Sequence, residues 1–238
     1  MQKILSYMRK AIEDYNMIED GDKIAVALSG GKDSISMLMG LKNLQRFYPK
    51  KFDLIAISIN PGFEFFDKKL LQTTCDNINV PLFIEDTHIK EIVFDLRKEK
   101  NPCSLCANFR RGALNTVAIR EGCNKIALGH NEDDVLETFM LNLLYTGSIN
   151  TFAPMSYMDR SKMTLIRPLI YAPEKYIKNF IKRNNITVMS KVCPMDGISK
   201  REDMKNIIND LRVDIPHIRA NLYGAIKRNI PEWKKCNL

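Results

Sequence analysis

Short apolar runs and amphipathic segments alternate along the first 170 residues of the chain. The runs at residues 23–28, 54–59 and 125–128 lack the alternation of a half-exposed strand, so they predict strands that are buried on both faces. Two shorter runs, at 81–84 and 164–166, predict two more strands. Buried strands of this kind are typical of a parallel sheet that helices cover on both sides.

Segments with apolar residues at helical spacing separate these strands. The clearest spans residues 131–145, where six apolar side chains predict one continuous stripe: Val135, Leu136, Phe139, Met140, Leu143 and Leu144. The other predicted helices of this part cover 3–18, 33–44, 66–77, 89–98 and a basic segment that ends near residue 120. This alternation predicts an α/β fold with a parallel five-stranded sheet flanked by helices.

The last part of the chain has a different pattern. Three helical segments, near 173–183, 201–212 and 216–228, follow one another without a strand between them, and they are rich in basic residues. We therefore predict one domain over residues 1–170, which includes the N-terminal helix, and a small helical, basic region over residues 171–238.

Composition narrows the class of protein. The 238 residues are 45% hydrophobic, which is enough for a core and excludes wholesale disorder. No apolar run approaches the roughly 20 residues that span a bilayer, and the charged N-terminus lacks a signal-peptide core, so we expect a cytoplasmic protein with no membrane partner. The net charge of +8 favours a polyanionic partner but is weak evidence on its own.

The sharpest motif is the hexapeptide Ser29-Gly30-Gly31-Lys32-Asp33-Ser34, between the first strand and a helix. The two glycines permit a tight turn that exposes backbone amides, and the helix start adds further unpaired N–H groups. Lys32 adds a cation. Because open α/β sheets bind ligands at the carboxyl ends of their strands, we expect a phosphate site here. The hexapeptide resembles the PP-loop of ATP pyrophosphatases, which split ATP between the α and β phosphates.

A second polar turn follows the fourth predicted strand and runs from Gly129 to Asp134. Its acids suit the first turn of a helix, and Asn131 suits an N-cap. The turn also emerges at the same sheet edge as the hexapeptide, so Asp133 and Asp134 are candidates to hold Mg²⁺ or to position ATP beside Lys32. The role of His130 in this turn stays open.

Of six cysteines, only Cys103 and Cys106 lie close together in the chain. Their spacing fits two ligands of a metal or cluster, or a redox pair. Cys193 is a candidate third ligand, although a lone cysteine is more often a small buried residue. Cys75 and Cys123 are interpreted as packing residues, and Cys236 in the tail is uninformative.

Three segments in this order, SGGKDS, PCSLC followed by FRRGALN, and KIALGHNEDDVLETFMLNLLYTG, resemble the tRNA 2-thiolation family and most closely its 2-thiocytidine synthetase branch. One departure is Ser190, which stands where that branch often has the first cysteine of a second C-x-x-C pair. The 2-thiouridine branch usually carries zinc-finger cysteines at both ends, and this chain has too few cysteines for them.

The resemblance implies a PP-loop enzyme that uses ATP with Mg²⁺ to adenylate the C2 carbonyl of a tRNA pyrimidine, most closely cytidine, and then replaces the oxygen with sulfur. It implies a [4Fe-4S] cluster on Cys103, Cys106 and Cys193, which act in catalysis with Lys32 and Asp33. The residues that match the nucleotide-binding motifs are Ser29, Gly30, Gly31, Lys32, Asp33, Ser34, Gly129, Asp133 and Asp134.

The implied partners are tRNA and a sulfur donor, either sulfide or a persulfide derived from a cysteine desulfurase; a homodimer is left open. Basic residues on predicted helices are candidates for contact with RNA phosphates. They are Arg110, Arg111, Lys175, Lys178, Lys182, Arg183, Arg219, Lys227 and Arg228. Two alternatives stay open: a PP-loop amidotransferase or carbon–nitrogen ligase that uses ammonia, and a nucleotide- or cluster-binding sensor without catalysis.

Overall fold

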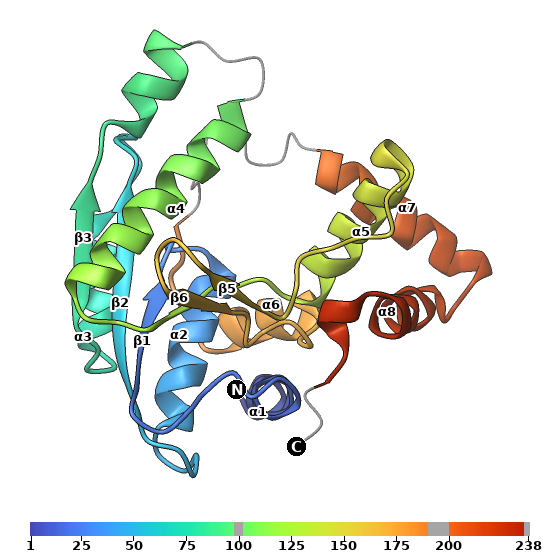
Figure 1. Ribbon diagram of the computed structural model, residues 1–238, viewed down its shortest axis with the longest axis horizontal. Coiled ribbons are helices and arrows are strands. Elements are labelled where there is room, and N and C mark those ends of the chain that lie inside the picture. The colour runs from blue at the N-terminus through green and yellow to red at the C-terminus, as the bar shows by residue number, and fades with distance from the viewer. Residues whose placement is uncertain (98–101, 190–199, 236–238) are drawn as a thin grey trace.

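The computed structural model describes residues 1–97, 102–189 and 200–235 of the chain. Its centre is a six-stranded sheet in the order β3-β2-β1-β4-β6-β5 (Figure 1). The strands are β1 (Asp22–Ala27), β2 (Phe52–Asn60), β3 (Leu82–Asp86), β4 (Lys125–Ala127), β5 (Met155–Met158) and β6 (Met163–Ile166). Five of them are parallel, which confirms the predicted α/β architecture, and their carboxyl ends meet at one edge of the sheet.

The prediction of five strands was wrong, because the sheet has a sixth strand, β5, at one edge. β5 runs antiparallel to β6, with Met155 opposite Ile166 and Met158 opposite Met163. Its four residues are all at least partly exposed. A short edge strand of this kind leaves no apolar run in the sequence, and it is recognised only through its pairing with β6.

Two hydrophobic cores lie on the two faces of the sheet, and β1 contributes to both. Ile24 and Val26 belong to the larger core, whereas Ala25 between them belongs to the smaller one, as expected for side chains that alternate along a strand. The helices on the larger core are α1 (Gln2–Asp14), α2 (Lys32–Leu44), α3 (Lys68–Asp76) and α6 (Glu174–Arg183). The smaller core is covered by α4 (Pro102–Arg120) and by the short π-helix η1 (Glu91–Leu96).

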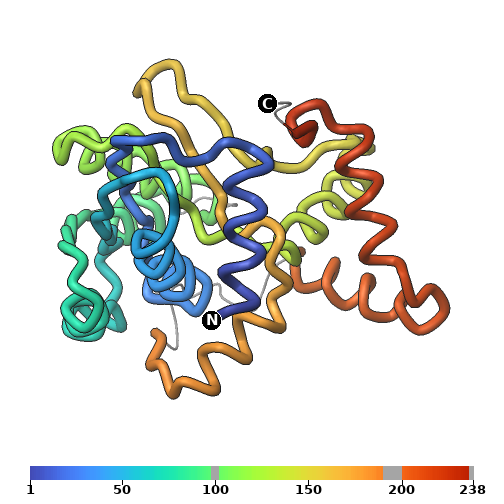
Figure 2. The backbone as a smooth tube through the Cα atoms, turned by 90° about the horizontal axis from the view of Figure 1, so that it is seen from below, coloured from blue at the N-terminus to red at the C-terminus, as the bar shows by residue number. Residues whose placement is uncertain are grey.

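The larger core also includes the helix that follows β4 and the helices at the end of the chain. They are α5 (Glu132–Thr146), α7 (Lys200–Asp214), α8 (Ile218–Asn229) and the 3-10 turn η2 (Pro231–Trp233). Seen from below, α1 lies beside α2 and α6 (Figure 2). The last turn is tied to α1 by Trp233, whose carbonyl accepts a hydrogen bond from the Tyr15 hydroxyl at 3.2 Å. The division at residue 170 stays a prediction.

The predicted stripe of α5 is buried only over its first half. Val135, Leu136 and Phe139 are in the larger core, but Leu143 and Leu144 are 37% and 56% exposed. The helix therefore extends past the core that its first two turns cover. Within the described residues, none of the helices combines the length and the apolar character that a membrane crossing requires.

Replacing Trp233 by Ala tests how firmly the C-terminal region is joined to this core. Trp233 is 1% exposed and its ring lies edge-on to the rings of Tyr15 and Tyr223. We expect the substitution to lower the free energy of unfolding by about 3–5 kcal/mol, as measured by urea denaturation. The exposed neighbour Glu232, replaced by Ala, should change it by less than about 0.5 kcal/mol. Equal values for the two variants would contradict a shared core.

Candidate functional site

The glycine-rich hexapeptide forms a tight loop between β1 and α2. Gly30 has a φ of +81°, and a Cβ added there would lie 2.6 Å from the Met189 sulfur, so the position requires glycine. Gly31 is the N-cap of α2 and offers no side-chain acceptor to the first amides of the helix. Ser34 turns back into the loop, where its hydroxyl oxygen accepts from the Ser29 amide at 3.2 Å. The free helix start makes the loop a suitable anion site.

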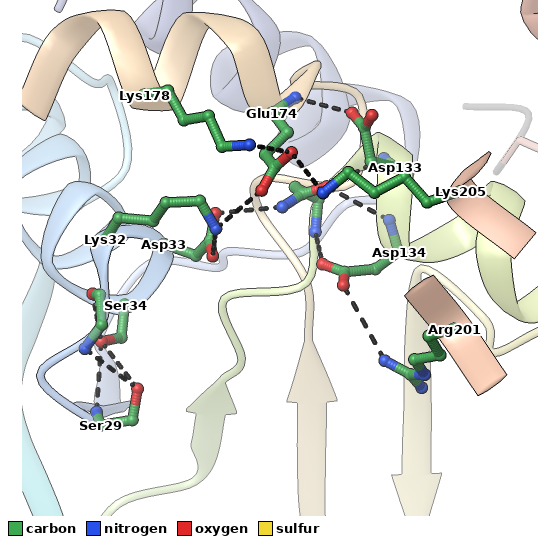
Figure 3. Close-up of polar contacts among 12 residues, drawn as sticks. Ser29, Lys32, Asp33, Ser34, Asp133, Asp134, Glu174, Lys178, Arg201 and Lys205 are labelled. Carbon is green, nitrogen blue, oxygen red and sulfur yellow. Dashed lines mark hydrogen bonds and ion pairs between the residues drawn. The ribbon is translucent and has the colours of Figure 1, made fainter. Parts of the chain in front are cut away.

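Lys32 lies at the centre of a charged network (Figure 3). Its ammonium is 2.7 Å from Asp33 and 2.9 Å from Glu174. Burial alone would lower the Lys32 pKa, but these two carboxylates outweigh it and raise the pKa above its ordinary value. Glu174 also contacts Lys178 at 2.9 Å and Lys205 at 3.3 Å. Lys32 is therefore held as a cation beside the phosphate loop.

The same network keeps the Glu174 carboxyl group ionised. Burial acts to raise its pKa, but hydrogen bonds from Lys178 and Lys32 prevail and lower the pKa to about 2. The sequence carries no signal for this residue, because it follows Pro173 in the first turn of an ordinary amphipathic helix and belongs to no motif. Only the packing of α6 beside α2 brings it to Lys32.

The turn from Gly129 to Asp134 joins the phosphate loop directly. The Asn131 side chain caps α5 by accepting from the amides of Asp133 and Asp134, and its Nδ2 donates to Asp33 at 3.0 Å. A Cβ on Gly129 would lie 3.2 Å from the Ser34 amide nitrogen, so any larger residue there would push the start of α2 away by a few tenths of an ångström. The expected meeting of the two turns at one sheet edge is confirmed.

The two aspartates of this turn occupy different environments. Both oxygens of Asp133 are engaged, one by the Glu174 amide at 2.7 Å and the other by Arg219 at 2.8 Å. Asp134 accepts from the Asn131 amide at 2.9 Å and lies 3.9 Å from Arg201. Burial, with a further contribution from Asp33, raises the Asp134 pKa to about 6. Asp134, rather than Asp133, therefore lies with Asp33 beside the phosphate loop.

The C-x-x-C pair lies in the first two turns of α4, with Cys103 exposed and Cys106 buried. Cys75 and Cys123 are buried in the larger and the smaller core, as predicted for packing residues, and burial raises the pKa of Cys75 to about 12 and that of Cys123 to about 11. Cys193 and Cys236 lie outside the described residues. In the described part of the chain, no three Cys, His, Asp or Glu side chains come together as a set of metal ligands.

A cavity of about 290 Å³ separates α4 from the carboxyl ends of β1 and β2. Its floor is apolar and includes Ile57 and Ile59, while Ser29 of the phosphate loop forms one wall. Arg110 and Arg111, which follow the cysteine pair by one turn, form the opposite wall. The helix that carries the cysteines therefore also encloses the space next to the phosphate loop.

His130, whose role the sequence leaves open, also lines this cavity, and Arg167 contacts it. Arg167 Nε donates to His130 Nδ1 at 3.2 Å, and its Nη1 donates to the Ala153 carbonyl at 2.7 Å. Burial and the charge of Arg167 lower the His130 pKa to about 3. Because Nδ1 accepts, the neutral imidazole carries its proton on Nε2. His130 therefore presents a hydrogen-bond donor rather than a base.

The basic residues proposed to contact RNA separate into groups. Arg110 and Arg111 line the cavity, Lys178 pairs with Glu174, and Arg219 pairs with Glu132 and Asp133. Lys227 lies over two tyrosine rings. Others lie exposed on α6 and α8: Lys175, Lys182, Arg183 and Arg228.

The sequence matches the PP-loop domain family over residues 2–206. It is 38% identical over 228 residues to the tRNA-cytidine(32) 2-sulfurtransferase of Syntrophotalea carbinolica, a match that covers 94% of this chain and 88% of the relative. The protein of the same name from Pelobacter propionicus is 37% identical over 225 residues, covering 93% and 84%. Among solved structures, the U34-tRNA thiolase NcsA from Methanococcus maripaludis with its [4Fe-4S] cluster has a TM-score of 0.76 at 26% identity. That match covers 95% of this chain and 77% of NcsA.

The state of His130 can be measured without a ligand. In ¹⁵N-resolved NMR spectra, we expect the His130 ring nitrogens to keep their neutral, Nε2-protonated signature from pH 8 to pH 4, because the pKa is about 3. A His130→Gln variant assigns the signal. Replacing Arg167 by Met removes the charge but leaves the burial, so the pKa should rise while staying below the ordinary value of about 6.5. A midpoint near 6.5 in the unmodified protein would show that His130 is open to solvent.

Proposed function

The chain belongs to the PP-loop tRNA 2-thiolation family, and from this membership we propose that it thiolates a pyrimidine of tRNA with the help of ATP. As a member of this family it is an enzyme. We propose that it transfers AMP to the C2 carbonyl oxygen of the pyrimidine and then replaces that oxygen with sulfur. Cytidine is the proposed base, because the curated relatives are named for it.

One observation supports this proposal above the others: α4 contributes both the cysteine pair and a wall of the cavity beside the phosphate loop. Cys103 and Cys106 are in its first two turns, and Arg110 and Arg111 line the cavity one turn later. An enzyme that must bring a sulfur atom to a carbon activated by ATP needs a sulfur-carrying site next to its nucleotide site. A ligase that uses ammonia would leave the cysteines without a role.

The cavity and the loop fit the two halves of ATP. The apolar floor formed by Ile57 and Ile59 suits the adenine ring, while the amides of Gly31 and the start of α2 suit the β and γ phosphates. Lys32 is already charged and adjacent, so it offsets the charge that develops on the departing pyrophosphate. The Nε2–H of His130 offers a neutral donor in the same cavity.

The residues present also fit Mg²⁺. Magnesium in nucleotide sites is held by one or two carboxylates together with phosphate oxygens. Asp33 and Asp134 meet this requirement, because both contact Asn131 and their mutual repulsion contributes to the raised Asp134 pKa. A cation between them would relieve that repulsion. Both oxygens of Asp133 are already taken, so we assign it to holding α6 and α8.

The cysteines fit a [4Fe-4S] cluster held by Cys103, Cys106 and Cys193. Residues three apart share a helix face, and the first turn of the helix favours a thiolate at Cys103. The charges of Arg110 and Arg111 favour thiolates as well. Cys193 lies outside the described residues, but Met189, four positions earlier, donates its amide to the Gly30 carbonyl at 2.9 Å. Four residues reach at most about 14 Å. When bound through three cysteines, such a cluster supplies an open iron that can carry sulfide.

The chemistry proposed for the chain has two substitutions. The pyrimidine oxygen attacks the α phosphorus of ATP, and pyrophosphate leaves with the electrons of the broken phosphorus–oxygen bond. Sulfide then attacks C2, and AMP leaves with the original oxygen. The protein holds the phosphates in line through the loop and Lys32, and α4 closes the cavity on the opposite side. The target base must be unstacked, which a tRNA loop permits more readily than a duplex.

The reaction products test the proposal directly. Anaerobically purified protein, incubated with tRNA, ATP, Mg²⁺ and sulfide, should release equal amounts of AMP and pyrophosphate and produce 2-thiocytidine, as measured by nucleoside mass spectrometry. A Lys32→Ala variant should lose at least about 100-fold in rate, since it removes a charged group that acts on the transition state. Thiolated uridine would correct the base assignment, and turnover with ammonia instead of sulfide would overturn the reaction.

Substitutions of the cysteines distinguish loss of the cluster from loss of nucleotide binding. We expect Cys103→Ala and Cys106→Ala to abolish both the brown colour of the cluster and thiolation, while the variants still bind ATP. Cys123→Ala is the matched control, because this buried thiol has a raised pKa and should leave colour and activity intact. Full activity in colourless Cys103→Ala protein would remove the cluster from the mechanism.

A further inference from the structure

A second cavity, distinct from the one beneath α4, lies on the other side of Glu174 from the phosphate loop. It is a groove of about 670 Å³ between the first turns of α5 and α6 and the helices α7 and α8. Its six basic residues come from α6, α7 and α8. They are Lys175, Lys178, Lys205, Arg212, Arg219 and Lys227.

The positive charge of the groove is only partly balanced. Three carboxylates line it, those of Glu132, Asp133 and Glu174, which leaves an excess of three positive charges. Three of the six cations form ion pairs with these carboxylates. Lys178 and Lys205 contact Glu174, and Arg219 contacts both Glu132 and Asp133.

The three remaining cations define the unbalanced part of the groove. Lys175, Arg212 and Lys227, one from each of three helices, form no ion pair with any residue that the structure describes. They point to an anionic occupant.

Lys227 shows most clearly that this surface favours an anion. Its ammonium lies 3.9 Å from the centre of the Tyr171 ring and 5.0 Å from that of Tyr223. Burial and the nearby charge of Lys10 lower its pKa. Asp14 and Glu132 oppose this shift but form no ion pair with Lys227. A cation that is half-buried, repelled by a neighbour and in contact with aromatic faces gains from a counter-anion more than a solvated lysine does.

The groove is continuous with the phosphate loop through a shared side chain. One oxygen of Glu174 contacts Lys32, while the other contacts Lys178 and Lys205, which line the groove (Figure 3). An extended polyanion seated in the groove therefore passes within one side chain of the loop. A single phosphate would fill little of 670 Å³, and it would not engage cations on three helices together.

We propose that this groove binds the phosphodiester backbone of the RNA substrate through Lys175, Arg212 and Lys227. The inference rests on the proposed function, since it assigns a docking surface to the RNA that the reaction needs. Cations that neutralise phosphates release counterions, so the affinity they contribute depends on salt and not on base sequence. The three paired cations contribute less, because each already has a carboxylate partner.

Filter binding of labelled tRNA to the full-length, anaerobically purified protein tests the groove, over a range of salt concentrations. Arg212→Gln and Lys227→Gln should each weaken binding by roughly 3- to 10-fold and reduce the slope of log K against log salt by about 0.7–0.9. Arg212→Lys and Lys227→Arg should restore both. Lys69→Gln on α3, an exposed lysine far from the groove, should change neither. Lys175→Gln, at an exposed position, gives a variant whose folding is not at risk.

The outcomes separate this inference from the proposed function. If the unmodified protein thiolates tRNA but the groove variants bind tRNA as tightly as Lys69→Gln does, the groove is not the RNA-binding surface and the proposed function stands. If the variants lose binding of pyrophosphate but not of tRNA, the groove is a small-anion site and the inference is wrong. If the unmodified protein neither binds nor thiolates tRNA, the proposed function itself fails. Parallel thermal denaturation identifies any variant that has unfolded.

Discussion

The Asn131 side chain holds the site together, because it bonds to both loops at the carboxyl edge of the sheet. Its oxygen accepts from the first amides of α5, and its Nδ2 donates to Asp33 at the start of α2. It is only 2% exposed, so neither group has ready access to water as an alternative partner. The relative position of the two helix starts, and with it the distance between Asp33 and Asp134, depends on this one amide.

Two glycines allow the segments at this edge of the sheet to come close together. Gly129 lies against the backbone of Asp33 and Ser34, and Gly30 lies beneath the Met189 side chain with its carbonyl bonded to the Met189 amide. A third segment, after α6, is thereby fixed to the phosphate loop. The edge of the sheet thus gathers three parts of the chain, and the space left between them is what a ligand can use.

Much of this arrangement could be predicted from local sequence, and the rest could not for physical reasons. Buried strands, helix starts and the Gly30–Gly31 loop depend on residues near in sequence, and the parallel topology then places both loops at one edge. β5 was missed because this edge strand is stabilised by its pairing with β6 and not by an apolar pattern of its own. Glu174 and Arg167 were missed because their partners, Lys32 and His130, are far away in the chain. The motif that contains Asp133 suggested a ligand, whereas Asp133 turns toward Arg219.

The distribution of charge explains why the net value of +8 says little about a polyanionic partner. The site gathers carboxylates from α2, α5 and α6 into a small, partly buried volume, and their repulsion has to be offset. Lys32, Lys178, Lys205 and Arg219 supply that compensation, so these cations stabilise the protein's own acids. Only basic residues that remain after this internal pairing are free to attract an external anion. A count of lysines and arginines therefore overestimates the surface available to a nucleic acid, and the pairing pattern identifies the part that is left.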